Sequence, residues 1–181
     1  MPLQKNQVLT LTIERLSNDG SGVAHSPDGE AVFIPGTAPG DVAAIRIVKD
    51  CGRYAFGILD AIQTPSPDRI PVDCVVAGSC GGCSLQHMDY GEQLRMKRAR
   101  VNDALTRIGG VSTPVQDIIG MEYPLCYRNK SIYAVGMKDG RVVKGFYRAS
   151  SHDVTPVEQC LLQLPLADKA AQAVCDWMDL R

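Results

Sequence analysis

The sequence of 181 residues lacks the long apolar runs on which membrane proteins depend. No stretch approaches the roughly 20 apolar residues that span a bilayer, and the first residues hold no apolar segment of signal-peptide length. Apolar residues make up 45% of the chain and charged residues 22%, which is typical of a globular protein with a packed core rather than of a disordered one. We therefore expect a cytoplasmic protein without membrane contact.

The sequence also lacks a recognisable active site. Gly20 and Gly22 form only part of a nucleotide-binding glycine motif, because the third glycine and the following helix are missing. The three histidines, His25, His87 and His152, stand apart from one another and from any obvious nucleophile, and no pair of carboxylates stands out. We predict no catalytic and no nucleotide-cofactor residue within this chain.

The first third of the sequence predicts a small β-barrel. Five short strand-like stretches are separated by glycine-rich turns, and they cover residues 8–13, 22–25, 30–34, 41–49 and 54–59. In the fourth stretch Ala43, Ile45 and Ile47 would share a buried face, with Arg46 pointing the other way. Five strands of this kind indicate an all-β barrel like the oligonucleotide-binding (OB) fold over residues 1–63.

The remainder predicts a linker, a cysteine loop and an α+β region. Three prolines within residues 64–71 exclude a helix or central strand, so we place the domain boundary there and assign residues 64–89 to the linker and loop. Residues 131–135 and 142–147 flank a hairpin turn at Lys138-Asp139-Gly140. Residues 90–181 are expected to form an incomplete α+β domain that begins and ends with a helix.

Both expected helices have apolar residues at helical spacing. In residues 90–108 the predicted packed side consists of Tyr90, Leu94, Val101, Leu105 and Ile108, and Gly109-Gly110 predicts the helix end. In residues 166–180 the predicted packed side consists of Leu166, Ala170, Ala173, Val174, Trp177 and Leu180.

Positive charge is concentrated in the middle of the chain. Residues 90–150 carry eleven Lys or Arg against five Asp or Glu, whereas the rest of the chain carries eight against fifteen. An anionic partner should therefore bind the middle of the chain, where the first expected helix carries Arg95, Lys97, Arg98 and Arg100. A solvated basic surface without a partner explains the charge equally well.

The seven cysteines are odd in number and uneven in spacing, which argues against a disulfide scaffold. Cys74, Cys80 and Cys83 share one short loop, and two glycines between the last two allow a tight turn, so the loop is typical of a metal site in a reducing compartment. The best candidate for a fourth ligand is Cys160, just past a predicted strand, and the second is Cys126. Zinc and a 4Fe–4S cluster fit this spacing equally well, and three reduced, buried cysteines without a metal are the third alternative.

Taken together, these motifs resemble a known family. They are Asn18-Asp-Gly-Ser-Gly-Val-Ala24, Phe33-Ile-Pro-Gly-Thr-Ala-Pro-Gly-Asp41, Cys74-x5-Cys80-Gly-Gly-Cys83-x2-Gln86-His87, Tyr127-Arg-Asn-Lys130 and Cys160. Over essentially its whole length the chain is similar to the front half of bacterial RNA uracil-C5 methyltransferases that carry an iron–sulfur cluster, the best known of which act on 23S ribosomal RNA. The resemblance implies that the barrel is a TRAM domain, an RNA-binding module. It also implies a 4Fe–4S cluster on Cys74, Cys80, Cys83 and Cys160, with a structural or RNA-organising role.

The same resemblance implies a reaction that this chain cannot perform alone. In the family a cysteine attacks uracil C6, the methyl group comes from S-adenosylmethionine, and a base removes the C5 proton. The residues for these steps would belong to a domain beyond residue 181, so the chain by itself is expected to be inactive.

RNA binding is the role left for these 181 residues. Arg128 and Lys130 match a basic motif of the family, Arg95, Lys97 and Arg98 lie near the cysteine loop in sequence, and Phe33 offers a stacking face together with Tyr54 and Phe56. Residues 1–62 hold five Lys or Arg and seven Asp or Glu, so the barrel itself is not basic. We expect a monomer that binds RNA, and the expected RNA partner is 23S ribosomal RNA. The alternative is a stand-alone, non-enzymatic RNA-binding protein with a structural four-cysteine metal site.

Overall fold

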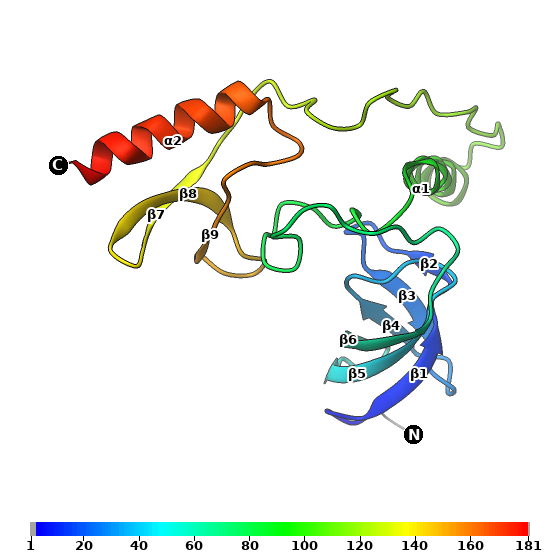
Figure 1. The fold of residues 1–181 in the computed structure, drawn as a ribbon. Coiled ribbons are helices and arrows are strands. Elements are labelled where there is room, and N and C mark those ends of the chain that lie inside the picture. The colour runs from blue at the N-terminus through cyan, green and yellow to red at the C-terminus, as the bar shows by residue number, and fades with distance from the viewer. Residues whose placement is uncertain (1–2, 181) are drawn as a thin grey trace. The chain divides into compact units, whose positions relative to one another are not determined.

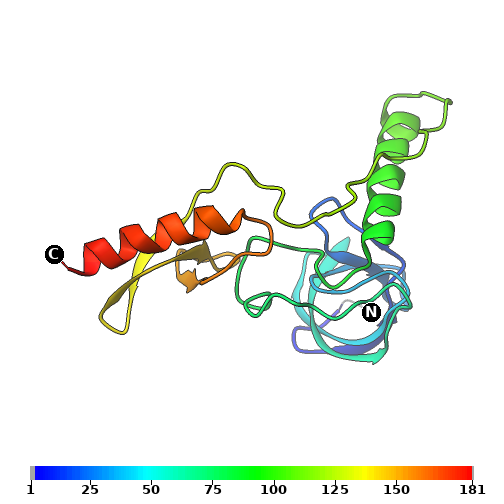
Figure 2. The same cartoon turned by 45° about the horizontal axis from the view of Figure 1, so that its top comes forward.

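The computed structural model describes residues 3–180 as two compact units that are interleaved along the chain (Figure 1, Figure 2). The first unit runs to Pro71 and resumes over Ser84–Ile119. The second unit takes Val72–Cys83 and the chain from Gly120 onward. The cysteine loop therefore belongs to one unit, while the segments on either side of it belong to the other.

A six-stranded, strongly curled sheet forms most of the first unit (Figure 1). Its strands are β1 (Val8–Thr12), β2 (Arg15–Leu16), β3 (Gly22–His25), β4 (Ala31–Ile34), β5 (Val42–Asp50) and β6 (Tyr54–Thr64). They lie in the order β1-β5-β6-β4-β3-β2, and only β4 and β6 run parallel. The five predicted strands are confirmed, and the predicted barrel is confirmed in part: the described sheet is a curled half-barrel with β1 and β2 at the two ends of the strand order.

The curl and the core have a common origin in β5 and β6. Their pairing shifts register at three points, and such bulges bend a sheet sharply. Ala43, Ile45 and Ile47 are completely buried on the inner side, as their alternation predicts, while Arg46 lies on the outer side and pairs with Asp60. The missed strand β2 has only two residues, too few to show a period in the sequence.

The first unit also contains the first predicted helix. It runs over α1 (Tyr90–Asp103) and ends in a single π-helical turn, η1 (Ala104–Ile108). Asp89 caps the start through its carboxylate, and Gly110 after the end has a left-handed φ of 64°, as the Gly109-Gly110 pair predicts.

The side of this helix expected to pack is covered only in its first turns. Tyr90 and Leu94 are half-buried, whereas Ile108 is 88% exposed, Val101 and Leu105 are exposed as well, and no residue of α1 or η1 is fully buried. Polar side chains add further contacts, which are Gln93 with the carbonyls of Leu85 and Met88, Asn102 with the Val115 amide, Arg95 with Asp68, Arg98 with Asp117, and Arg100 with the Asn18 carbonyl. These contacts join the helix to segments far along the chain, which helical spacing cannot reveal.

The second unit consists of a three-stranded antiparallel sheet and one helix (Figure 2). Its strands are β7 (Ala134–Lys138), β8 (Arg141–Tyr147) and β9 (Val154–Pro156), and α2 (Pro165–Asp179) packs against β8. The predicted hairpin is confirmed, since Asp139 and Gly140 join β7 to β8 with left-handed φ values.

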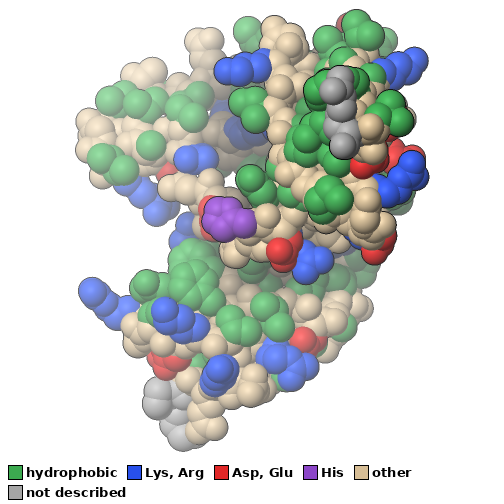
Figure 3. Space-filling view, turned by 90° about the vertical axis from the view of Figure 1, so that its left-hand side faces the viewer, with side chains coloured by type: hydrophobic (Ala, Val, Ile, Leu, Met, Phe, Trp, Pro, Cys, Tyr) green, Lys and Arg blue, Asp and Glu red, His purple; other side chains and the backbone are tan. Residues whose placement is uncertain are grey.

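Helix α2 also packs with a different side from the one its apolar spacing indicates. Asp168 and Cys175 are buried, whereas Leu166 is 76% exposed and the rest of the predicted packed side is exposed as well. Hydrophobic side chains accordingly reach the molecular surface in several places (Figure 3). The physical reason is the Asp168 carboxylate, whose hydrogen bonds to the interior of the unit turn the helix. No helix within residues 3–180 combines the length and the apolar character that crossing a membrane would take.

Candidate functional site

All four predicted cysteine ligands lie in the second unit. Cys74, Cys80 and Cys83 are on the loop Val72–Cys83, and Cys160 follows β9. Each is partly buried and none of these four is in a disulfide. Cys126, the second candidate for the fourth ligand, lies in the same unit but is exposed. The structure thus brings the four thiols into one compact body.

Strands β8 and β9 hold the cysteine loop through its backbone. The Gly81 amide donates to the Tyr147 carbonyl at 2.9 Å, and the Thr155 hydroxyl donates to the Ser79 carbonyl at 3.3 Å. A Cβ on Gly81 would stand 2.9 Å from the Ala149 nitrogen, closer than real Cβ atoms come to a neighbour. Glycine is therefore required here by a close backbone approach, and not only by the tightness of the turn.

The predicted donor set consists of four thiols, which zinc and iron–sulfur clusters both take as ligands. Within residues 3–180, no three His, Cys, Asp or Glu side chains come close enough together to hold one metal ion. In a 4Fe–4S cluster each thiolate binds a different iron, so the four cysteine sulfurs lie farther apart than they do around a single metal ion. A cavity of about 720 Å³ in the same unit opens beside Cys74. The ligand set Cys74, Cys80, Cys83 and Cys160 remains a prediction.

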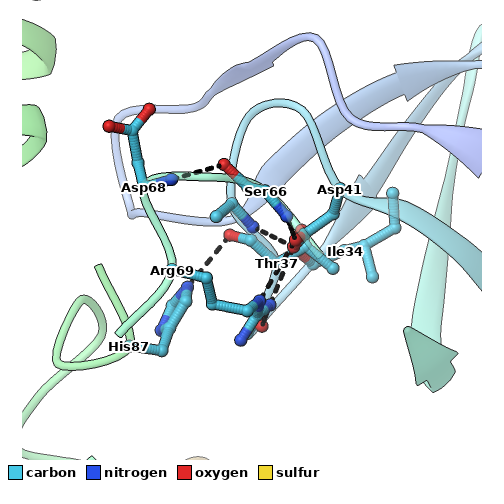
Figure 4. A network of polar contacts seen from close by, with 9 residues as sticks. Ile34, Thr37, Asp41, Ser66, Asp68, Arg69 and His87 are labelled. Atoms are coloured by element: carbon cyan, nitrogen blue, oxygen red, sulfur yellow. Dashed lines mark hydrogen bonds and ion pairs between the residues drawn. The ribbon is translucent and has the colours of Figure 1, made fainter. Parts of the chain in front are cut away.

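A buried polar network in the first unit anchors the segment that leads into the cysteine loop (Figure 4). Asp41 is completely buried, and its carboxylate accepts hydrogen bonds from the amides of Ala38 and Ser66 and from the Arg69 guanidinium, at 2.7–3.1 Å. Burial alone would raise the pKa of Asp41, but the Arg69 guanidinium and the two amides outweigh it and lower the pKa below its ordinary value.

His87 anchors the segment that leaves the cysteine loop. Its Nε2 lies 3.1 Å from the Thr37 carbonyl, which can only accept, so this nitrogen carries the proton. Burial lowers the pKa of His87, and the nearby Arg69 charge lowers it further, although the Thr37 hydrogen bond opposes both. The backbones also pair, because Ile70 donates to His87 and Asp89 donates to Asp68. Both stems of the loop are therefore tied to the sheet.

These two lowered pKa values predict a loss of stability in acid. The unfolded chain takes up protons near the ordinary pKa values of 6.5 for His87 and 3.8 for Asp41, while the folded chain takes them up only at lower pH. The free energy of unfolding should therefore fall as pH drops below about 6.5, and again below about 3.8. Urea titrations followed by circular dichroism test this. His87→Gln, which can still donate to the Thr37 carbonyl, should remove the first fall, and an unchanged pH profile in that variant would contradict the assignment.

The predicted stacking residue Phe33 is part of an aromatic triad on the first unit. Its ring centroid lies 5.9 Å from those of Tyr54 and Phe56, which lie 5.6 Å from each other. Strands β4 and β6 place Phe33 directly beside Phe56, and Tyr54 and Phe56 are each 41% exposed. Lys49 on β5 lies across from Phe56 and is exposed. The sheet thus presents an aromatic surface beside a cation.

The predicted basic contacts fall into two groups. Arg95, Lys97 and Arg98 belong to α1 in the first unit, and Arg128 and Lys130 belong to the second. Arg95 pairs with Glu92 and Asp68, and Arg98 pairs with Asp117, so these two charges are partly neutralised, while Lys97 and Lys130 are exposed. The backbone of Arg128 pairs with the segment around Gln163.

Two buried ionic networks were not predicted from the sequence. They centre on Asp41 with Arg69 and on Asp168 with Lys144, pairs separated by 28 and 24 positions. No spacing rule connects residues so far apart. The one available signal was a charged residue within an otherwise apolar strand, as at Lys144 in Val142–Phe146.

Comparison with protein families identifies the first part of the chain. The TRAM domain family matches residues 2–59, which span the curled sheet almost completely. Residues 2–59 form a TRAM domain. The fold around the TRAM domain is also known: the solved structure of the transfer RNA (uracil-54, C5)-methyltransferase of Pyrococcus abyssi covers 94% of this chain with a TM-score of 0.61, at 21% identity.

The similarity continues beyond the TRAM domain. An uncharacterized RNA methyltransferase of Listeria monocytogenes is 43% identical over 94% of this chain, and one of Bacillus cereus is 41% identical over 96%. The chain is thus related to RNA methyltransferases. It spans only 37–38% of the length of these two relatives, and 37% of the Pyrococcus chain.

Proposed function

We propose that this chain is the RNA-binding, 4Fe–4S-carrying part of an S-adenosylmethionine-dependent RNA uracil-C5 methyltransferase that acts on 23S ribosomal RNA. The observation that carries the proposal is the similarity to RNA methyltransferases over 94–96% of the chain, which includes the cysteine loop and Cys160 as well as the TRAM domain. Methyl transfer itself is assigned to the part of these relatives that the chain does not span.

Exposed apolar surface supports the proposal that this chain is part of a longer protein. The side of α2 that carries Leu166, Val174 and Leu180 is open to solvent, as is Ile119 at 98% exposure. Soluble monomers rarely leave large apolar patches uncovered. A further domain of the same polypeptide would cover such surface, in keeping with the 37–38% of the relatives' length that is present here.

The aromatic triad supports RNA as the ligand of the TRAM domain. Single-stranded RNA is bound by stacking its bases on exposed aromatic rings and by placing cations along its phosphates. Phe33, Tyr54 and Phe56 supply rings on adjacent strands, and Lys49 supplies a cation beside them.

The purified chain should bind 23S ribosomal RNA fragments, and the affinity should fall steeply as salt rises. Binding releases cations from the RNA phosphates, and this release favours binding less when the salt concentration is high. Fluorescence anisotropy at several salt concentrations measures this, with transfer RNA and duplex DNA of similar length as competitors. Preference for the ribosomal fragment supports the proposal, whereas preference for transfer RNA would assign the substrate of the Pyrococcus neighbour instead. Equal affinity for duplex DNA would contradict specific RNA binding.

A further inference from the structure

A buried carboxylate lies behind the proposed fourth ligand. Asp168, in the first turn of α2, is only 4% exposed. Its Oδ2 accepts a hydrogen bond from the Cys160 backbone amide at 3.0 Å, and its Oδ1 accepts from the Tyr133 hydroxyl at 2.7 Å and from the Lys144 ammonium at 3.3 Å. The backbone of Cys160 is thus tied directly to a charge in the interior of the second unit.

Lys144 ties the residues just before Cys160. Its side chain is buried, and Nζ donates to the carbonyls of Val157 and Glu158 at 2.7 and 2.8 Å as well as to Asp168. All three ammonium donors are therefore engaged. The Tyr133 ring lies 5.1 Å from Nζ, which adds a cation–π contact. The segment 157–160 is held at two carbonyls by Lys144 and at one amide by Asp168.

The same strand also holds the other cysteines. Lys144 lies on β8, and Tyr147 at the end of β8 accepts the Gly81 amide within the turn from Cys80 to Cys83. Cys74 lines the cavity that Lys144, Val157 and Glu158 also line. Strand β8 is thus the common support of both parts of the cysteine set.

Stability alone does not explain this arrangement. A buried ion pair is often no more stabilising than apolar residues of the same size, because both charges lose their hydration. Here three of the four hydrogen bonds that the two side chains make outside their own ion pair end on the backbone of residues 157–160, and the fourth comes from Tyr133. The network defines the position of one short segment, and Cys160 is the residue of that segment with metal-binding chemistry.

We propose that Asp168, supported by Lys144 and Tyr133, is a positioning residue that holds the Cys160 backbone so that its thiolate faces the other three cysteines and retains the cluster. The proposal rests on the proposed function, which makes Cys160 a ligand. Hydrogen-bonding partners behind metal ligands orient them, and their loss typically weakens metal retention by about 10–100-fold.

The test measures iron, sulfide and visible absorbance in protein purified without air, and the rate at which a chelator removes iron. Asp168→Ala should release iron about 10–100-fold faster than the unmodified chain, and Asp168→Asn, which keeps an oxygen for the Cys160 amide, should lie between them. Lys169→Ala is the matched control, because Lys169 is next to Asp168 on the same helix, is exposed and does not line the cavity beside Cys74. Its release rate should not change.

The possible failures can be told apart. An unmodified chain that is colourless or holds zinc would overturn the cluster, and the proposed function would fail before any variant is made. If the unmodified chain holds iron and folded Asp168→Ala releases it at the same rate, Asp168 is structural only. Should Asp168→Ala fail to fold, Tyr133→Phe decides: it removes a single donor to Asp168, and faster release supports positioning while unchanged release overturns it.

Discussion

Replacing Asp41 with alanine should lower the free energy of unfolding of the first unit by about 3 kcal/mol, the lower end of the range for breaking a buried ion pair. The substitution removes the acceptor of two buried amides and of Arg69. Arg69 keeps 21% of its side chain exposed and can regain some hydration, which places the loss at the lower end. Because Ser66 and Arg69 belong to the stem of the cysteine loop, the stem should also loosen.

Asp60→Ala is the matched control, since it removes the partner of Arg46 from an exposed pair of the same 2.7 Å length. Exposed pairs contribute at most about 1 kcal/mol. Urea unfolding followed by circular dichroism should separate the two variants. The single tryptophan, Trp177, belongs to the second unit, so its fluorescence reports on that unit independently. Equal losses in the two variants would show that the buried network contributes no more than a surface pair.

Local patterns were sufficient wherever a few neighbouring residues decide the structure. Alternation located the five longer strands and the buried side of β5, and Asp139-Gly140 and Gly110 marked a hairpin and a helix end. Each depends on backbone preferences or on a period of two residues, which are properties of a short window.

Long-range polar contacts decided what those patterns could not. Apolar spacing indicates which side of a helix could pack, but the Asp168 hydrogen bonds turn α2 the other way, and polar contacts from Gln93 and Arg100 join α1 to other segments. The parallel pairing of β4 with β6, which makes the aromatic triad, likewise joins distant residues. For the same reason, spacing suggested three cysteines of the candidate site but not the network behind the fourth.

The double substitution Tyr54→Ala and Phe56→Ala should weaken binding of single-stranded RNA by at least about 30-fold. Stacking of a base on an aromatic ring contributes about 1–3 kcal/mol, and 1.4 kcal/mol is a tenfold change in affinity. Both rings are 41% exposed and contact Phe33, so their loss removes most of the stacking surface of the triad while the buried core of the sheet stays intact. Fluorescence anisotropy with a short uridine-rich RNA at fixed salt gives the affinity.

Ile58→Ala provides the matched control for this prediction. Ile58 lies on the same side of β6 as Tyr54 and Phe56 and is 46% exposed, but it has no aromatic ring. Its replacement removes apolar area without removing a stacking partner, so RNA affinity should stay within about twofold, as expected for a change below 0.5 kcal/mol. If Ile58→Ala weakens binding as much as the double variant, the sheet binds RNA through apolar area in general. If the double variant unfolds more easily yet binds RNA normally, the three rings serve the fold, and RNA contacts must come from basic residues such as the exposed Lys97 and Lys130.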